Sequence, residues 1–261
     1  CYIVIYKKDT FYDKMRAERF FWPQIKAVFA QLKLGVPIGL SIFFEVSSFT
    51  LMAIFISRLG EETVSAHQIV ANLTSMLYMV PLSLGIASSV LISQSLGARW
   101  PAVAEFILRR TLKISIVIAA VLATLLYIFK GNVIALYTSD AGVAATAAAL
   151  VAFGCTYHVF DAMQAVSSFA LRGYRVTRAP MFIYGIMLWG VGIGIGYQLA
   201  FGAEWAGGPY GAFGFWGATA VGLILTGLSL LAMALWVGRQ RSRDEHHSPE
   251  EVERVIREAR A

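Results

Sequence analysis

The chain has 261 residues, of which 57% are hydrophobic and 15% charged, and its mean hydropathy is +0.64. Soluble globular domains carry roughly 45–50% apolar and about 25% charged residues, and this departure excludes disorder, a fibrous repeat and a disulfide scaffold. The apolar runs reach the ~20 residues that a ~30 Å hydrocarbon layer requires, which argues against a soluble enzyme. The sequence therefore predicts an all-α, polytopic membrane protein.

The first 33 residues precede the predicted membrane lobe. Residues 1–6 are apolar and end at two lysines. One interpretation makes them the end of a truncated preceding transmembrane helix, and the other makes Cys1 a lipid-modified mature N-terminus; the first is favoured. Residues 7–33 form a basic, partly amphipathic connector that we expect in the cytoplasm. Cys1 and Cys155 are far apart in the chain, so no disulfide is expected.

Six apolar runs then predict a transmembrane lobe of six helices over residues 34–238. Pro37 and Pro81 fall inside two of these runs, where membrane helices tolerate kinks. The predicted spans are residues 34–57, 64–96, 114–129, 141–171, 179–203 and 213–237.

Loop charges set the orientation of these spans. All but two of the 22 Lys and Arg residues fall on one side of the layout, and the exceptions are Arg58 and Lys130. Cytoplasmic loops carry the excess of basic residues in membrane proteins, so both ends of the lobe are expected in the cytoplasm. The net charge of +6 is then a topology signal, and no nucleic-acid partner is expected.

Residues 239–261 form a predicted cytoplasmic tail. Within it, Ser248 can cap a helix, and Pro249 suits the first helical position. The pattern favours a short helix over residues 248–260, lying on the membrane or on the body of the protein, with a disordered tail as the alternative.

Only two of the 16 acidic residues, Glu45 and Asp161, lie deep inside predicted spans. A charged side chain at the bilayer centre costs at least ~2.5–3.5 kcal/mol on insertion scales. Two such acids on different helices favour an ion or proton site over a structural role.

Polar side chains recur at helical spacing around these acids, and we interpret them as the lining of a wet cavity between helices. Interhelical hydrogen bonding by Ser and Asn is the alternative interpretation. The stripes are Ser41, Glu45 and Ser48; Gln68, Asn72 and Ser75; and Tyr157, Asp161, Gln164 and Ser168.

Such a site can work in two ways, and the residues do not choose between them. Burial disfavours a charged carboxylate, so the pair can hold a proton and release it when water or a cation enters. Alternatively, Glu45 and Asp161 can bind a sodium ion together with neighbouring neutral oxygens. No phosphate-binding loop, HExxH or paired CxxC occurs, so we expect no enzyme, cofactor or catalytic metal. The alternating glycines 190, 192, 194 and 196 indicate close helix packing.

Several short motifs, in order, resemble the second half of multidrug and toxic compound extrusion (MATE) transporters of the NorM type. No single motif is decisive, but together they extend over nearly the whole chain. They are GVPIG at 35–39, FFE at 43–45, AHQI at 66–69, PLSLG at 81–85, DAMQ at 161–164, LRGY at 171–174 and GFW at 214–216.

The resemblance implies the C-terminal six-helix lobe of a twelve-helix transporter in the bacterial inner membrane, with the N-terminal lobe as its missing partner. Its function would be export of lipophilic cations by antiport with sodium or protons. The family's coupling-cation positions match Glu45 and Asp161, with Tyr157 one turn away. Its substrate-contacting positions match Phe49, Gln68 and Asp140, and the polar stripes add Asn72 and Gln164 to the expected cavity.

Two other functions compete with this prediction. A flippase for lipid-linked sugars, from the same superfamily, would be expected to have more basic residues in the cavity, and no Lys or Arg is predicted inside a span. An intramembrane aspartyl protease would need paired Asp residues in local motifs that Glu45 and Asp161 do not supply.

Overall fold

A computed structural model of the chain describes residues 24–202, 204, 207–243 and 249–258. Its contacts divide the chain into two units, residues 1–36 and residues 37–261. In the first unit, the described residues 24–36 belong to the start of helix α3 (Ile25–Ile56). The other helices and the cavities lie in the second unit. The predicted helix end at 1–6 falls outside the described residues.

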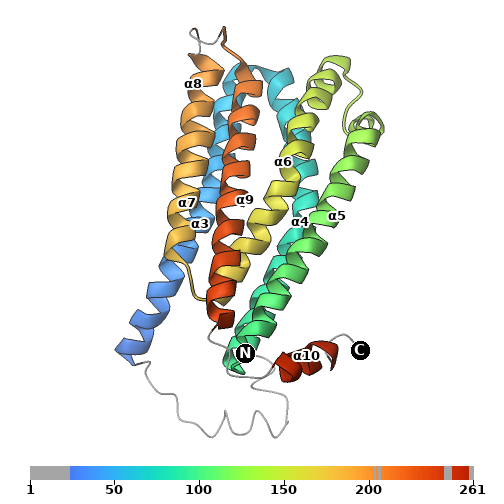
Figure 1. The fold of residues 1–261 in the computed structure, drawn as a ribbon. Helices are drawn as coiled ribbons and strands as arrows, with labels where there is room; N and C mark the ends of the chain where they lie inside the picture. The colour runs from blue at the N-terminus through green and yellow to red at the C-terminus, as the bar shows by residue number, and fades with distance from the viewer. Residues whose placement is uncertain (1–23, 203, 205–206, 244–248, 259–261) are drawn as a thin grey trace, which may run out of the picture. The chain divides into compact units, whose positions relative to one another are not determined.

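Six helical spans are long and apolar enough to cross a membrane, which confirms the predicted number. Successive spans run in opposite directions (Figure 1), and the described residues contain no strand. After α3, a short 3-10 turn, η1 (Ser57–Leu59), leads into the next span. The remaining spans are α4 (Glu61–Gly97), α5 (Pro101–Ala135), α6 (Ala141–Gly173), the three-part span Arg178–Phe201, and α9 (Gly211–Arg243).

Several helices are longer than the sequence predicted, and α3 and α5 are two examples. Helix α3 begins at Ile25, within the predicted connector, and α5 covers Pro101–Ala135 instead of 114–129. The prediction followed hydropathy, which marks the lipid-embedded part of a helix, whereas a helix continues into water as long as its backbone bonds are made. Lys and Arg are good helix formers and so do not end either helix.

The fifth span is not a uniform α-helix. It consists of α7 (Arg178–Tyr184), eleven residues of π-helix in η2 (Gly185–Ile195), and α8 (Gly196–Phe201). Glycine disfavours the α-helix by about 1 kcal/mol relative to alanine, so this glycine-rich stretch loses less by adopting wider turns. A Cβ atom at Gly196 would meet Phe215 of α9 at 3.0 Å, whereas Gly190 faces open space. The predicted packing role of the alternating glycines is therefore wrong for Gly190.

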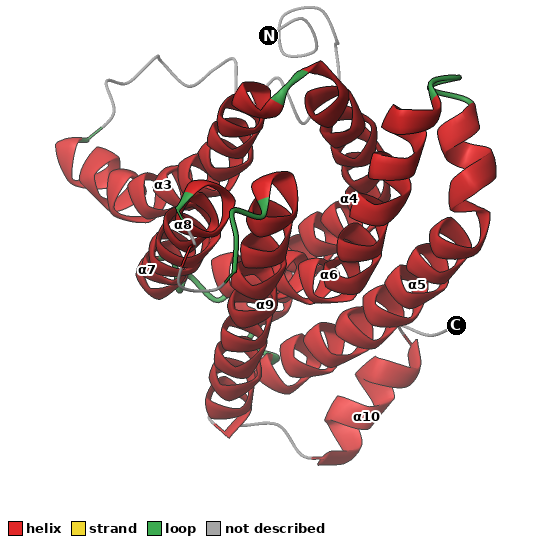
Figure 2. Cartoon of the chain, turned by 90° about the horizontal axis from the view of Figure 1, so that it is seen from above, coloured by secondary structure: helices red, strands yellow, loops and turns green. Residues whose placement is uncertain are grey.

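Helix α6 packs against α4, α5 and α9 (Figure 2) and carries the most buried stretch of the chain. Small residues allow these helices to approach closely, as membrane helices commonly do. A Cβ atom added at Gly154 would lie 2.8 Å from Thr74 of α4, and one added at Gly227 would lie 2.5 Å from the backbone oxygen of Phe160. The close approach of α6 to α9 at Gly227 is thus between backbones, whereas at Gly154 the neighbour on α4 is the Thr74 side chain.

Helix α3 contacts the other spans mainly through large side chains. It lies beside the fifth span (Figures 1 and 2), where Phe44 meets the Trp189 ring edge-on at 5.7 Å. Phe55 stacks on Phe215 at 5.8 Å, and the Trp189 indole N–H donates to Ser47 at 3.0 Å. The position of α3 consequently depends on side chains rather than on close backbone approach.

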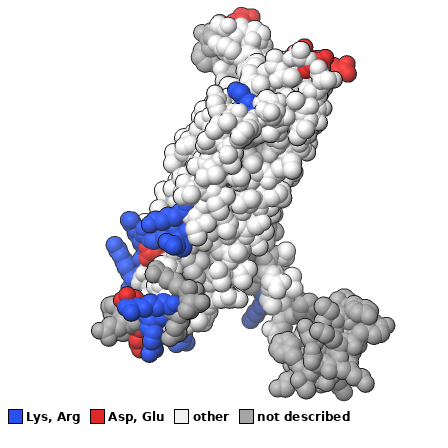
Figure 3. All heavy atoms as spheres, turned by 90° about the vertical axis from the view of Figure 1, so that its right-hand side faces the viewer, with Lys and Arg blue, Asp and Glu red and all other residues white. Residues whose placement is uncertain are grey.

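Charged residues gather toward the two ends of the view in Figure 3, and a broad band between them is almost free of charge. The outer face of α5 in this band is apolar and exposed, as expected of a lipid-facing surface. We call the end that carries most Lys and Arg the basic end. Its residues in the second unit are Arg99, Arg109, Arg110, Lys113, Arg172, Arg175, Arg178, Arg239, Arg241 and Arg243.

The tail contains α10 (Pro249–Glu258), which confirms a short helix there, and this helix packs against α5. An ion pair between Arg257 and Glu253, 2.8 Å apart, spans one turn of it. The predicted cap, Ser248, lies outside the described residues.

Substitution of Gly227 tests the close approach of α6 and α9. Gly227→Ala should lower the free energy of unfolding by about 1–3 kcal/mol, because the backbone carbonyl of Phe160 cannot move away independently of its helix. The measurement is the thermal midpoint of the purified chain in detergent. Gly190→Ala is the matched control, since its Cβ meets nothing within 4 Å. An equal loss of stability in both variants would contradict this packing.

Candidate functional site

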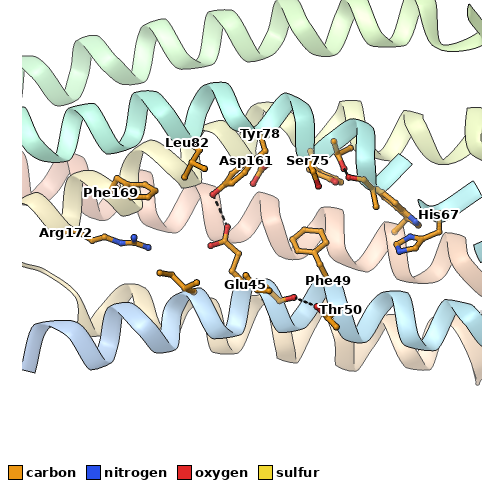
Figure 4. A pocket seen from close by; sticks show the side chains of 16 residues that line it. Glu45, Phe49, Thr50, His67, Ser75, Tyr78, Leu82, Asp161, Phe169 and Arg172 are labelled. Atoms are coloured by element: carbon orange, nitrogen blue, oxygen red, sulfur yellow. Dashed lines mark hydrogen bonds between the residues drawn. The ribbon is translucent and has the colours of Figure 1, made fainter. Parts of the chain in front are cut away.

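A cavity of about 470 Å³ lies between α3, α4 and α6, with Trp216 of α9 at its wall (Figure 4). Glu45 of α3 and Asp161 of α6 both line it, so the structure brings together the two acids that the sequence singled out. The other lining residues are Ile42, Val46, Phe49, Thr50, His67, Ala71, Thr74, Ser75, Tyr78, Leu82, Tyr157, Phe169, Arg172 and Trp216.

Glu45 extends from α3 toward Asp161 and Tyr78, as Figure 4 shows. The Tyr78 hydroxyl donates a hydrogen bond to the Glu45 Oε1 atom at 3.2 Å, and the Gln164 Nε2 atom donates to the same oxygen at 3.0 Å. Tyr78 lies on α4 and Gln164 on α6. A single carboxylate therefore links three helices.

Gln164 is fully buried next to this acid. Its Nε2 atom also donates to the Tyr184 hydroxyl at 2.7 Å, so both donor hydrogens of the amide have acceptors. The Gln164 Oε1 atom has no hydrogen-bond partner. Gln164 is not among the residues that line the cavity, so in this structure it positions Glu45 and does not form part of the wall.

Asp161 is buried, with 9% of its surface exposed, and lies close enough to Glu45 for two charged carboxylates to repel each other. Tyr157, one turn away on α6, stacks on Trp216 with ring centroids 6.2 Å apart. The cavity thus brings two carboxylates together beside a stacked aromatic pair.

The predicted polar stripes contribute less to the cavity than the sequence suggested. Ser41 and Ser48 do not line it, because their hydroxyls donate to their own helix, to the backbone oxygens of Pro37 and Glu45 at 2.8 Å. Hydroxyls within membrane helices commonly satisfy themselves in this way. On α3, only Glu45 of its stripe lines the cavity.

Gln68 and Asn72 line a neighbouring hollow of about 450 Å³ on α4, which shares Ala71 and Ser75 with the main cavity. The Tyr137 hydroxyl donates to the Asn72 side-chain oxygen at 2.9 Å. Asp140 lies elsewhere. It caps α6, its carboxylate accepting from the Val143 backbone N–H at 2.9 Å, so the structure gives it a capping role and not a place in the cavity.

The sequence analysis did not single out Tyr78, Thr74 or Trp216 as lining residues. Tyr78 lies three residues after Ser75 on the same face of α4, so extending the Gln68–Asn72–Ser75 stripe by one turn would have found it. Nothing in the local sequence of Trp216 indicated that it faces Tyr157 across two helices.

Arg172 directly follows the predicted span 141–171, so the sequence places it in a loop. It lies near the end of α6 and lines the cavity instead, with its guanidinium 4.3 Å from the centre of the Phe169 ring. The long stem of Arg lets a residue at a helix end reach inward. The cavity therefore contains two acids and, among the described lining residues, one base.

Comparison with known proteins identifies the family. The MatE family profile matches residues 37–198, which is more than half of the chain. The chain belongs to the MatE family. The chain is 43% identical over 203 residues to the probable multidrug resistance protein NorM of Aromatoleum aromaticum, and 34% identical over 213 residues to the multidrug resistance protein PmpM of Pseudomonas aeruginosa. These alignments cover 78% and 82% of the chain but only 44% of either relative.

Solved MATE structures share the fold. The chain aligns with the eukaryotic MATE transporter AtDTX14 at a TM-score of 0.75 and 21% identity, covering 93% of this chain and 54% of the other. The Vibrio cholerae MATE transporter VcmN in its bent form gives a TM-score of 0.75 at 14% identity, covering 90% and 52%. The six spans thus form a MATE-type helical lobe, and the MatE chain studied here spans about half of each full transporter.

Gln164 tests the hydrogen-bonded link between α3 and α6. Gln164→Leu keeps the side-chain volume but removes a donor from Glu45, and it should lower the free energy of unfolding by about 1–3 kcal/mol. Thermal unfolding in detergent measures this loss. Gln198→Leu, an exposed glutamine in the fifth span, should have a negligible effect. Equal midpoints for the two variants would show that the link is not stabilising.

Proposed function

We propose that the transporter containing this chain exports lipophilic organic cations by antiport with sodium ions or protons. The observation that carries the proposal is the meeting of Glu45 and Asp161, from α3 and α6, in one cavity with aromatic walls. The names of the relatives, which are multidrug resistance proteins, support the class of substrate.

Glu45 and Asp161 would bind the coupling ion, with Tyr157 supporting Asp161 from one turn away. A proton would neutralise one carboxylate and end the repulsion between the two acids. A sodium ion would do the same through coordination by the two carboxylates. Both modes place the ion where α3, α4 and α6 meet.

The substrate would occupy the remaining volume. Phe49 offers an aromatic face for a cation, and such contacts are worth about 0.5–2 kcal/mol. Gln68 and Asn72 extend the polar surface into the adjoining hollow. The part of the relatives that this chain does not cover would supply an N-terminal lobe, which would close the cavity from the opposite side.

The setting we propose is the bacterial inner membrane, with the basic end and the C-terminus in the cytoplasm. The Lys and Arg distribution supports this orientation, because positive loops are retained on the cytoplasmic side. Alternating access around a midplane site is the common mechanism of repeat-built transporters. Binding of the ion and of the drug would each favour one of two states of the lobe.

A flippase for a lipid-linked precursor is the second candidate. The observation in its favour is Arg172, a base in the cavity wall that could bind an anionic headgroup. The guanidinium already lies over Phe169, and two acids share the cavity with it, so the balance of charge favours a cationic substrate.

The test uses the full-length transporter in an efflux-deficient bacterium, with ethidium as the substrate and with sodium and pH varied separately. Glu45→Gln and Asp161→Asn should each lower ion-dependent efflux by about tenfold or more, within the range of typical coupling energies. Membrane insertion should be unchanged, since each variant removes a buried charge.

Glu61→Gln is the matched control, because it makes the same acid-to-amide change at an exposed position in the first turn of α4, outside the cavity. Full efflux from the Glu45 and Asp161 variants would refute the coupling site. Absence of ethidium efflux from the well-inserted unmodified protein, under every sodium and pH condition, would favour the flippase.

A further inference from the structure

A second large cavity lies at the basic end of the second unit, away from Glu45 and Asp161. Its volume is also about 470 Å³. It is formed where the last turns of α9 pass the connection between α6 and α7. The lining residues are Val176, Trp236, Val237, Gln240, Arg241 and Arg243.

Two of the residues that line this cavity, Arg241 and Arg243, have basic side chains. Arg241 and Arg243 are exposed, and neither forms an ion pair with an acid within the described part of the chain. Gln240 adds an amide group that can donate further hydrogen bonds. Two guanidinium groups and an amide around one hollow suit an anion with several oxygen atoms, because guanidinium groups bind phosphate oxygens bidentately.

The position of the cavity indicates where such an anion comes from. Trp236 has 59% of its surface exposed and lies one turn before Gln240 on α9. Exposed tryptophan at the end of a membrane span is typical of the boundary between hydrocarbon and headgroups. The cavity therefore lies at headgroup depth, with the apolar, exposed face of α9 leading from it into the membrane; that face carries Val221, Leu225, Leu228 and Trp236.

We propose that this cavity binds the phosphate headgroup of an anionic phospholipid from the surrounding leaflet. Arg241 and Arg243 hold the phosphate oxygens, Gln240 donates to the headgroup, and the acyl chains lie along α9 past Trp236. The proposal requires that the chain spans a membrane, but it does not rest on the proposed transport function. Its test measures lipid retention, so failure of either proposal leaves the other unaffected.

The test is native mass spectrometry of the purified full chain after incubation with equal amounts of palmitoyl-oleoyl phosphatidylglycerol and phosphatidylcholine. We expect preferential retention of one phosphatidylglycerol. Arg241→Gln together with Arg243→Gln should lower that retention by about thirtyfold, since each base near the surface contributes about 1 kcal/mol. Arg241→Lys with Arg243→Lys keeps the charge but loses the bidentate geometry, and should lower retention by about threefold.

The control pair is Arg110→Gln with Lys113→Gln, which removes the same charge from exposed positions at the same end, on α5 and outside the cavity. It should leave retention within about twofold of the unmodified chain, because diffuse surface charge acts weakly through solvent. Equal losses in the two glutamine pairs would overturn the proposal, as would equal retention of phosphatidylcholine. If the variant with Arg241→Gln and Arg243→Gln does not fold, the variant with Arg241→Lys and Arg243→Lys is compared with the Arg110→Gln, Lys113→Gln control instead. Equal losses of retention in these two variants would overturn the proposal.

Inorganic phosphate and glycerol phosphate, added in millimolar excess, separate a lipid site from a site for a soluble anion. Retained phosphatidylglycerol should survive both, because its acyl chains contribute binding energy that neither competitor has. Displacement by either competitor would show that the cavity binds a free phosphate and would overturn the lipid assignment.

Discussion

The arrangement of this lobe depends on the need to stabilise a carboxylate inside a membrane-spanning bundle. Glu45 obtains its hydrogen bonds from Tyr78 on α4 and Gln164 on α6. Such a group is costly in hydrocarbon unless it is paired. Because the two donors lie on different helices, satisfying one acid also determines how α3 faces α4 and α6, and Glu45 and Tyr78 both line the cavity between these helices.

The second acid adds to this requirement. Asp161 lines the same cavity as Glu45, and two charged carboxylates in one cavity repel each other, so the coupling ion that we propose would stabilise the pair. Aromatic side chains form much of the wall, where Trp216 and Tyr157 stack on each other. Apolar walls strengthen electrostatic interactions inside a cavity, because they are less polarisable than water.

The sequence predicted the six spans and the two buried acids, since both depend on single-residue properties, hydropathy and charge. It predicted less well what depends on side-chain direction. Ser41 and Ser48 have the spacing of lining residues but bond to their own helix, and Arg172 was placed in a loop by its position although its stem reaches the cavity. The partnership of Tyr157 with Trp216 joins residues 59 positions apart, and no local pattern encodes it.

The close contacts at glycines have a mechanical consequence. At Gly154 and Gly227, α6 approaches its neighbours α4 and α9 so closely that there is no room for a methyl group. At Gly227 the clash would be with the backbone of α6, and a Cβ atom at Gly173 of α6 would lie 2.9 Å from the backbone oxygen of Ser89 on α4. Sliding of these helices past one another would therefore bring backbone atoms into contact, which resists relative movement of α4, α6 and α9. A Cβ atom at Gly39 of α3 would meet nothing within 4 Å, so no such contact at this position resists movement of the helix that carries Glu45.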